Sequence, residues 1–486
     1  MTEMKTRAAW NRRAWALGLL TCVSSLAAAP DAFASGLFYT DRGVRPMGRG
    51  GAFVAGADDI GAVWYNPAGL ADAGTSVLAD FSWLHFSSDF SRRTLAPDAS
   101  GTERLYVFPT VSGTTPVLPI PTLGASFNFP KAKQFTVAFA IYAPMTAIAS
   151  YPLTLNDGTP SPSRYSLVSL NGSALVIAGL YAAYKPIEQL RFGLGLQALA
   201  GNFDSTVTFS ACPPGGLVCA PEDTNWDALS QLKVGPIFAP SANFGVTAVP
   251  DKHVRVGLST QLPFHVDAPA QVNVRLPNAV VFDNASQSGY DAHVKFDLPA
   301  VFRAGVEVRG PVGPGELRAE VAFVREFWTT HHSIDITPDN ITLLKVTGFP
   351  SPFAVSPISL PRNFDNANSY RLGAEYGFKL GDYVLDTRLG LSYEQSAVPA
   401  AYLAPLTIDM NKVTLGLGGG LHIGEHWRLD AVYAHVFASD VTVDPSVAAV
   451  PKVNPVRGNA TPSESINGGD YHATADVLGV GLNYKF

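Results

Sequence analysis

Residues 478–486 read LGVGLNYKF, and apolar residues occupy every second position of this stretch. Successive side chains of a β-strand point to opposite faces. One face would therefore carry Leu, Val, Leu, Tyr and Phe, and the other Gly, Gly, Asn and Lys. This period of two predicts a strand with one apolar and one polar face.

The stretches 370–379, 384–394 and 413–423 show the same alternation, and their charged residues fall on one face. A soluble β-sandwich would turn the apolar face inward, whereas a membrane barrel turns it toward lipid and keeps a polar lumen. The number of repeats and the targeting segment described below favour the membrane. The pattern predicts fourteen strands, at 75–90, 108–129, 134–145, 163–184, 188–208, 229–248, 253–267, 290–309, 315–329, 367–379, 383–396, 411–423, 426–440 and 471–486.

Short and long connections alternate between these strands. Short ones such as 130–133 and 424–425 are followed by long ones such as 146–162 and 330–366. Outer-membrane barrels have an even number of strands, short periplasmic turns and long extracellular loops. We therefore predict an all-β protein whose residues 73–486 form a 14-stranded antiparallel transmembrane β-barrel in a Gram-negative outer membrane.

Residues 1–34 have the features of a signal peptide: a basic start, a short apolar run at 15–29 and a small-x-small cleavage site ending at Ala34. The run is too short to span a bilayer, and no later stretch is long and apolar enough to do so. Lipid attachment at Cys22 is an alternative, but the preceding Thr fits it poorly. The formal net charge of −6 argues against a nucleic-acid partner.

Residues 48–71 read GRGGAFVAGADDIGAVWYNPAGLA, a run of Gly, Ala and small polar residues. Such a segment is too small-residued for a lipid-facing strand, and its Gly and Pro disfavour a long helix. Glycine allows irregular backbone to pack closely against other backbone. We therefore expect residues 35–72 to fold as a hatch inside the lumen.

This segment resembles the amino-terminal hatch of the FadL/TodX family, outer-membrane transporters of long-chain fatty acids and other hydrophobic compounds. The strand LPAVFRAGVEVR (298–309) and the terminal GVGLNYKF also resemble the family pattern. The resemblance implies a 14-stranded barrel plugged by the hatch. The hatch and gate residues that it implies are Gly48, Arg49, Gly50, Asn66, Pro67, Ala68 and Gly69.

The third strand carries Tyr142, Ala143 and Pro144, which also resemble the family pattern. Proline cannot donate a ladder hydrogen bond, and a closed barrel has no edge strand to hold it. With Pro119 and Pro121 in the second strand, this predicts a local break in pairing. The family has a kinked third strand that releases apolar ligand sideways into the membrane, and we expect a kink before Pro144. The alternative is that these prolines only end their strands early.

Apolar residues in the long loops are candidates for capturing a hydrophobic ligand, because exposed loops rarely carry so many without a partner. Alternatively, the loops pack on one another. The candidates include Val280, Phe282, Leu343, Phe349 and Phe353.

A carboxylate headgroup would need a cation in the lumen. Arg303, Arg371 and Arg388 lie on polar strand faces and are the candidates. Each could instead pair with a wall carboxylate such as Glu307, Glu375 or Asp386.

Cys212 and Cys219 lie in a Pro/Gly-rich loop, which in an exported protein predicts a disulfide. A metal site is a weaker alternative, and His331-His332 is expected to be solvated. We expect no catalytic residues, no metal and no cofactor, hence no enzyme.

The sequence predicts a monomeric transporter for passive uptake of hydrophobic molecules, whose partners are that ligand and outer-membrane lipid. A structural or adhesive barrel that binds a partner through its loops is an alternative. An aromatic-hydrocarbon channel of the same family is another. A water-filled porin is disfavoured, because the hatch would fill its lumen.

Overall fold

The computed structural model describes residues 41–97, 102–117, 119–144, 149–212, 219, 222–454 and 465–486. The predicted signal peptide lies outside them. Within the described residues, no helix is long and apolar enough to cross a bilayer.

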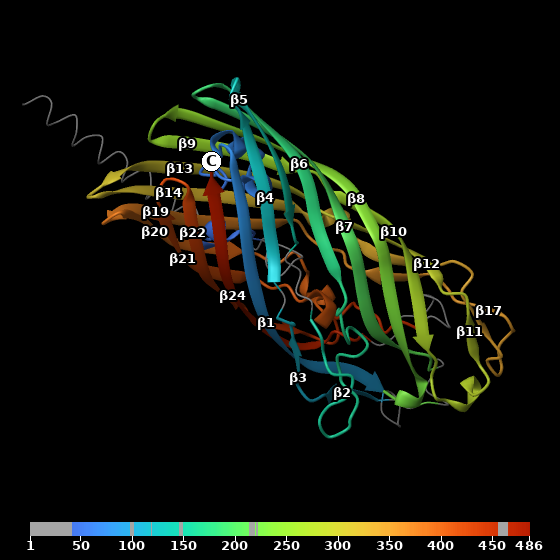
Figure 1. The fold of residues 1–486 in the computed structure, drawn as a ribbon. Helices are drawn as coiled ribbons and strands as arrows, with labels where there is room; N and C mark the ends of the chain where they lie inside the picture. The colour runs from blue at the N-terminus through green and yellow to red at the C-terminus, as the bar shows by residue number, and fades with distance from the viewer. Residues whose placement is uncertain are drawn as a thin grey trace, which may run out of the picture.

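Fourteen strands form the wall of a closed antiparallel barrel, and some of them are divided into two shorter strands that follow one another (Figure 1). Closure is made by β1, which pairs with β4 on one side and with β24 on the other. The wall strands, in order, are β1 (Ser76–Pro97), β4 (Pro119–Phe129), β5 (Ala132–Tyr142), β6 (Ala174–Ile187), β7 (Leu190–Ser210), β8 (Asp227–Asp251), β9 (Val254–Gln261) continued by β10 (Phe264–Arg275), β12 (Asp291–Leu298) with β13 (Ala300–Val312), β14 (Gly315–Phe327) with β15 (Ser333–Pro338), β18 (Ile358–Pro361) with β19 (Ala367–Leu380), β20 (Tyr383–Glu394), β21 (Lys412–Ile423), β22 (Trp427–Ala438) and β24 (Gly469–Lys485).

The predicted number of strands is confirmed, and several predicted boundaries are wrong. Residues 163–173 do not extend β6, which begins at Ala174. The loop after β14 contains four short strands, of which β15 and β18 continue the wall beyond the predicted ends. The short elements outside the main wall are β2 (Glu103–Val107), β3 (Val111–Thr114), β11 (Ser286–Ser288), β16 (Thr342–Leu344), β17 (Phe353–Ala354) and β23 (Val441–Val443).

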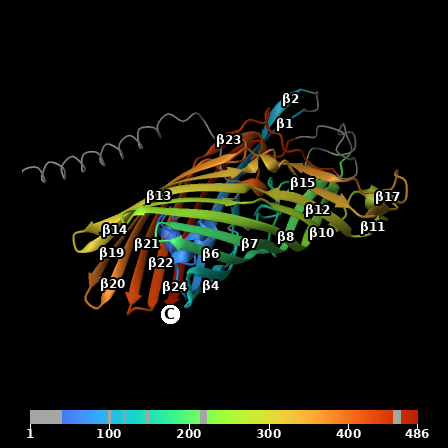
Figure 2. The ribbon, with the colours of Figure 1, turned by 90° about the horizontal axis from the view of Figure 1, so that it is seen from above.

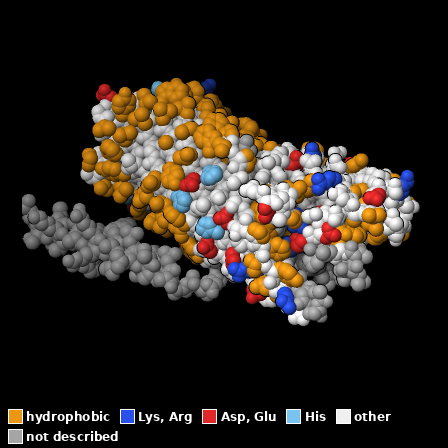
Figure 3. Space-filling model, turned by 90° about the horizontal axis from the view of Figure 1, so that it is seen from below, with side chains coloured by type: hydrophobic (Ala, Val, Ile, Leu, Met, Phe, Trp, Pro, Cys, Tyr) orange, Lys and Arg blue, Asp and Glu red, His pale blue; other side chains and the backbone are white. Residues whose placement is uncertain are grey.

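The apolar faces of the strands point outward, as the alternation predicts. Leu180, Leu196 and Phe238 are each more than 60% exposed, whereas Glu307 and Glu320 on the inner face are fully buried. Figure 3 shows hydrophobic side chains gathered as a band over one half of the molecule, with most charged side chains on the other half. An exposed apolar band on the outside of the wall, around a polar lumen, is what a lipid-embedded barrel requires.

Residues 41–72, here called the lumen segment, are enclosed by the strands near the C-terminal end of the barrel (Figures 1 and 2). The segment contains α2 (Val44–Gly48), α3 (Ala62–Tyr65) and η2 (Pro67–Asp72), and most of its residues are buried. Wall glycines allow this close approach: a Cβ on Gly390 would lie 1.8 Å from the nitrogen of Gly50.

Four neighbouring wall strands are each interrupted, and we call this row of interruptions the crease. The interruptions separate β9 from β10, β12 from β13, β14 from β15 and β18 from β19. Prolines explain two of them, because Pro263 and Pro299 cannot donate to the ladder. The wider breaks after β14 and β18 bury the side chains of Trp328, His331, Arg362 and Phe364.

Candidate functional site

A cavity of about 460 Å³ lies among the creased wall, the extracellular halves of β7 and β8 and the ends of β4, β5 and β6. Nearly all of the side chains around it are apolar. The lining includes Phe86, Leu167, Leu199, Phe203, Leu232, Val234, Phe296, Leu298, Trp328, Ile334, Leu360, Phe364 and Ile408. A space of this size and polarity suits a molecule with a sizeable hydrocarbon part.

Among the residues that the structure describes, the strand pairing of the wall is interrupted beside this cavity. β5 ends at Tyr142, and its neighbour β6 begins only at Ala174, whereas β7, the next strand along, continues to Ser210. Trp83 is the last β1 residue paired with β4, and pairing resumes at Ser87 with β3. Figure 1 shows β4 stopping partway along β1. We call this interruption the window.

Isolated bridges close the wall again on the long-loop side of the window. Thr114 bridges to Ser150, Ser150 to Ser169, and Ser169 to Thr206 of β7. The opposite rim carries Pro119 and Pro121 of β4 with Ala143 and Pro144 beyond β5, and all four line the cavity. The cavity therefore reaches the wall at the predicted kink.

The lumen segment touches the strand that ends at the window. The ring of Trp64 lies edge-on to Tyr142, with 5.7 Å between centroids. The guanidinium of Arg303 stacks on the same indole at 4.5 Å. Trp64 thus joins the lumen segment to both the window and a buried cation.

Among the described residues, Arg362 is the one Lys or Arg that lines the apolar cavity. It is 3% exposed, and its side chain makes no hydrogen bond or ion pair with any residue that the structure describes. Burial alone lowers the pKa of its guanidinium to about 10. Burying a charge without a partner is costly, so an anion would be well accommodated there.

His331 lines the same cavity and is 6% exposed, so the expectation that it is solvated is wrong. Its Nδ1 is 2.7 Å from the carbonyl oxygen of Asp297 and donates to it. Burial, reinforced by the charge of Arg362, lowers the pKa of the imidazole to about 4. The ring is therefore neutral at physiological pH.

Two of the three arginines predicted to bind a headgroup already have carboxylate partners. Arg371 pairs with Asp41 and Glu394, and Arg388 lies 2.7 Å from Glu375 and 2.6 Å from Asp430. Arg303 has no carboxylate partner among the described residues, but it is occupied by the face of Trp64. None of the three lines the apolar cavity.

Charged residues bind the lumen segment to the wall. Arg45 donates to Glu375 at 2.7 Å, and Arg49 donates to Glu307 at 2.8 Å. Glu320 accepts hydrogen bonds from three successive backbone amides, at 54–56. Because these groups are buried, breaking one pair leaves an uncompensated charge, which costs about 3–5 kcal/mol.

Comparison with known proteins now assigns the chain. Residues 25–486 match the model of a family described as outer membrane protein transport protein (OMPP1/FadL/TodX). The chain belongs to the FadL/TodX family. Membership places it in the outer membrane, among transport channels for hydrophobic compounds.

Solved structures share the fold of this FadL/TodX-family protein at low sequence identity. A FadL homologue of Pseudomonas aeruginosa is 15% identical with a TM-score of 0.67, over 93% of this chain and 100% of that one. The toluene transporter TodX of Pseudomonas putida is 12% identical with a TM-score of 0.56, over 94% and 99%. The toluene transporter TbuX of Ralstonia pickettii is 16% identical with a TM-score of 0.55, over 92% and 98%.

A curated relative matches over a shorter stretch. An outer membrane protein of Neisseria meningitidis serogroup B is 26% identical over 120 residues, which is 24% of each chain.

Asn66 in the hatch-like motif of this FadL/TodX-family protein is fully engaged by the fold. Its Nδ2 donates to the carbonyl oxygen of Val54 and to Thr247 Oγ1, at 2.9 and 3.0 Å. Its Oδ1 accepts from the amide of Ala68 at 3.1 Å. The motif packs against wall glycines, since a Cβ on Gly193 would meet the backbone of Pro67 and Ala68. It does not line the apolar cavity.

The apolar loop residues of this family member mostly pack on one another. Phe282 and Leu343 are buried in one cluster with Phe353 against it, while Val280 and Phe349 remain exposed. Phe282 and Leu343 also line a second apolar cavity of about 60 Å³, which shares Ile336 with the larger one. The two cavities therefore adjoin.

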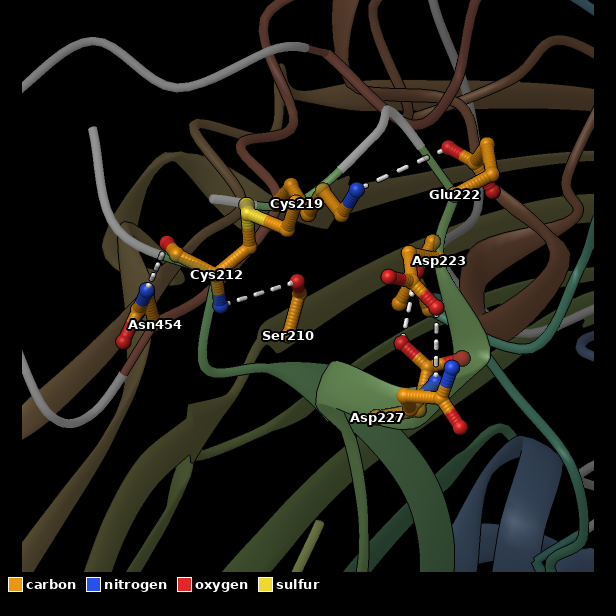
Figure 4. Close-up of a disulfide and its surroundings, with 10 residues drawn as sticks. Ser210, Cys212, Cys219, Glu222, Asp223, Asp227 and Asn454 are labelled. Atoms are coloured by element: carbon orange, nitrogen blue, oxygen red, sulfur yellow. Dashed lines mark hydrogen bonds and ion pairs between the residues drawn. A yellow bond between two sulfur atoms is a disulfide. The ribbon is translucent and has the colours of Figure 1, made fainter. Parts of the chain in front are cut away.

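Cys212 and Cys219 are bonded through their sulfurs, with 6.1 Å between Cα atoms (Figure 4). The Nδ2 of Asn454 donates to the carbonyl oxygen of Cys212 at 3.1 Å. Nearby, Arg164 pairs with Asp227 at 2.8 Å and with Glu222 at 3.0 Å. The disulfide closes the loop after β7 on itself, and the hydrogen bond from Asn454 joins that loop to a distant segment of the chain.

Proposed function

We propose that the protein takes up hydrophobic molecules that carry one anionic headgroup, such as long-chain fatty acids, by passive diffusion. The observation that carries this proposal is the buried Arg362, whose side chain has no partner among the described residues, in a cavity lined mostly by apolar side chains. An aliphatic tail would gain about 0.8 kcal/mol for each CH₂ that leaves water. A carboxylate would supply the partner that Arg362 lacks.

Arg362 favours a carboxylate over a neutral hydrocarbon. A toluene-like ligand would leave the guanidinium buried and unpaired, which costs free energy. The related structures named for toluene transport show only that the fold accommodates such ligands elsewhere in the family.

Capture would begin at the adjoining apolar cavity of the loops, where Phe282 and Leu343 lie. Release would follow sideways through the window, past Ala143 and Pro144, into the membrane. Release through a part of the wall that faces lipid would spare a hydrophobic ligand from crossing water. Only differences in affinity and concentration are needed, and no chemical step.

The lumen segment would act as the hatch that excludes free aqueous flow, with residues 35–72 as its predicted extent. Its buried ion pairs with the wall support this role. Planar-bilayer recordings should show no large steady current, and a porin-like current would contradict the plug.

Uptake by cells tests the proposal directly. A strain without its own transporter should accumulate labelled hexadecanoate when it expresses this protein. Arg362→Met should reduce accumulation about tenfold or more, because a charge-assisted bond contributes about 1.5–3 kcal/mol. Arg275→Met, at an exposed site on β10, is the matched control and should behave as wild type.

Labelled toluene separates the alternatives. If wild type accumulates toluene but not hexadecanoate, the protein is a hydrocarbon channel and the proposal is wrong. If neither accumulates, a structural or adhesive barrel replaces it. Equal hexadecanoate uptake by Arg362→Met and wild type would mean that Arg362 does not bind the carboxylate headgroup.

A further inference from the structure

The cavity presents a second unsatisfied polar atom next to Arg362. His331 Nδ1 donates to Asp297, and Nε2 has no hydrogen-bond partner in the described chain. The backbone holds the two residues together, because the amide of Phe364 donates to the carbonyl of His331 and that of Arg362 to His332. Both side chains line the same apolar space.

The tautomer of His331 follows from its one hydrogen bond. A carbonyl oxygen can only accept, so Nδ1 carries the proton. A neutral ring then leaves Nε2 without a proton, as a hydrogen-bond acceptor. The ring is fixed by packing, with its centroid 5.0 Å from that of Phe364 and 5.7 Å from that of Trp328.

This part of the cavity therefore presents a cation, the Arg362 guanidinium, together with a neutral acceptor, the Nε2 atom of His331. An unsubstituted fatty acid would satisfy Arg362 and bury Nε2 without a donor. A hydrocarbon would satisfy neither group. A ligand that complements both carries an anion and, a few bonds away, a hydroxyl that can donate.

We propose that Arg362 and His331 select long-chain acids that bear a hydroxyl group close to the carboxylate. The carboxylate accepts from the guanidinium, and the hydroxyl donates to His331 Nε2. The tail occupies the apolar part of the cavity toward Leu232 and Phe203. This inference rests on the proposed function and names the substrate class of the same site.

The specificity comes from a single hydrogen bond. One neutral hydrogen bond that replaces an unsatisfied buried acceptor changes affinity by about tenfold. A hydroxyl at the far end of the tail would instead be buried among aliphatic side chains, which disfavours it. Position along the chain, and not polarity alone, should decide binding.

Competition binding with the purified full chain tests this. Labelled hexadecanoate is displaced by unlabelled hexadecanoate and by its α-hydroxy, β-hydroxy and ω-hydroxy derivatives. We expect the better of the α- and β-hydroxy acids to displace at about tenfold lower concentration than hexadecanoate. The ω-hydroxy acid should be no better than hexadecanoate.

Two variants assign the effect to the ring. His331→Phe keeps an aromatic ring among Trp328 and Phe364 but has no acceptor, so it should displace label at similar concentrations of the hydroxy acid and of hexadecanoate, whatever its absolute affinity for either. His331→Gln offers an amide oxygen as acceptor and should recover part of the preference for the hydroxy acids.

The outcomes separate the two proposals. If the wild-type protein binds hexadecanoate and shows no preference for a hydroxyl near the acid group, this inference is wrong while the proposed function stands. A preference that survives in His331→Phe would also overturn it. Failure to bind any of the acids would overturn the proposed function itself.

Discussion

At the scale of single residues, the cavity is defined by two side chains that burial makes unusual. Arg362 keeps its charge without a carboxylate beside it, and His331 stays neutral because it is buried. Sites whose ionisable groups are strongly perturbed are often functional, since such groups destabilise a fold unless a ligand uses them. The paired arginines of the lumen differ, because carboxylates next to them offset the cost of their burial.

The neutral state of His331 makes a prediction about pH. Its pKa is lowered from 6.5 to about 4, so between these values the unfolded chain binds a proton that the folded chain does not. The free energy of unfolding should therefore decrease as the pH falls from 6.5 to about 4, by at most about 3 kcal/mol. Arg362 and His332 oppose protonation, and Asp297 favours it.

Chemical unfolding in detergent micelles at pH 7 and at pH 4.5 measures this effect. His331→Gln cannot take up the proton, so its stability should fall less than that of wild type between the two pH values. Equal losses in the two proteins would mean that His331 is accessible and charged in the folded state.

At the scale of elements, the window depends on where β4 and β5 stop. Pro119 and Pro144 flank the two strand ends and cannot donate ladder bonds. On the long-loop side of the window, within the described residues, β3 pairs with β1, and single bridges join Thr114, Ser150 and Ser169. The interruption therefore lies in the backbone pairing of the wall, and we expect its rim residues to decide whether a ligand can pass.

Filling the rim should separate binding from release. Ala143→Trp places a large side chain where the cavity meets the window, so uptake should drop several-fold while hexadecanoate still binds. Ala182→Trp, on the exposed face of β6, is the matched control and should leave both unchanged. Unimpaired uptake by Ala143→Trp, with the variant folded, would mean that ligand leaves by another route.

Alternation along each strand predicts the barrel because lipid and lumen make opposite demands on successive side chains. The same rule could not predict Arg362 or His331, which lie in breaks of the crease and not in regular strands. The sequence does contain one indication: Arg362 lies between the apolar residues Leu360 and Phe364 in a long loop. Periodicity does not show that such a loop folds inward, since that depends on contacts with distant strands.

The predicted headgroup arginines illustrate the same limit. Arg371 and Arg388 do face the lumen, as the alternation requires. Their partners include Glu394 and Asp430 on nearby strands and Asp41 in the lumen segment. Facing the lumen is therefore a property of one strand, whereas being free to bind a ligand depends on the side chains that other elements bring next to it.

At the scale of the whole molecule, two kinds of interior occupy one barrel. Near the short turns, the lumen segment and wall form a dense network of buried ion pairs that includes Arg45, Arg49 and Glu375. Toward the long loops, the interior becomes an apolar cavity that meets the wall at the window. A hydrophobic ligand would thus be stopped by the charged plug and turned toward the membrane.

A crystal structure with bound hexadecanoate would test this account most directly. We predict the carboxylate within hydrogen-bond distance of the Arg362 guanidinium, with the tail in the apolar cavity. Density for the carboxylate at Arg303, Arg371 or Arg388, or for the tail within the charged lumen below Trp64, would contradict it.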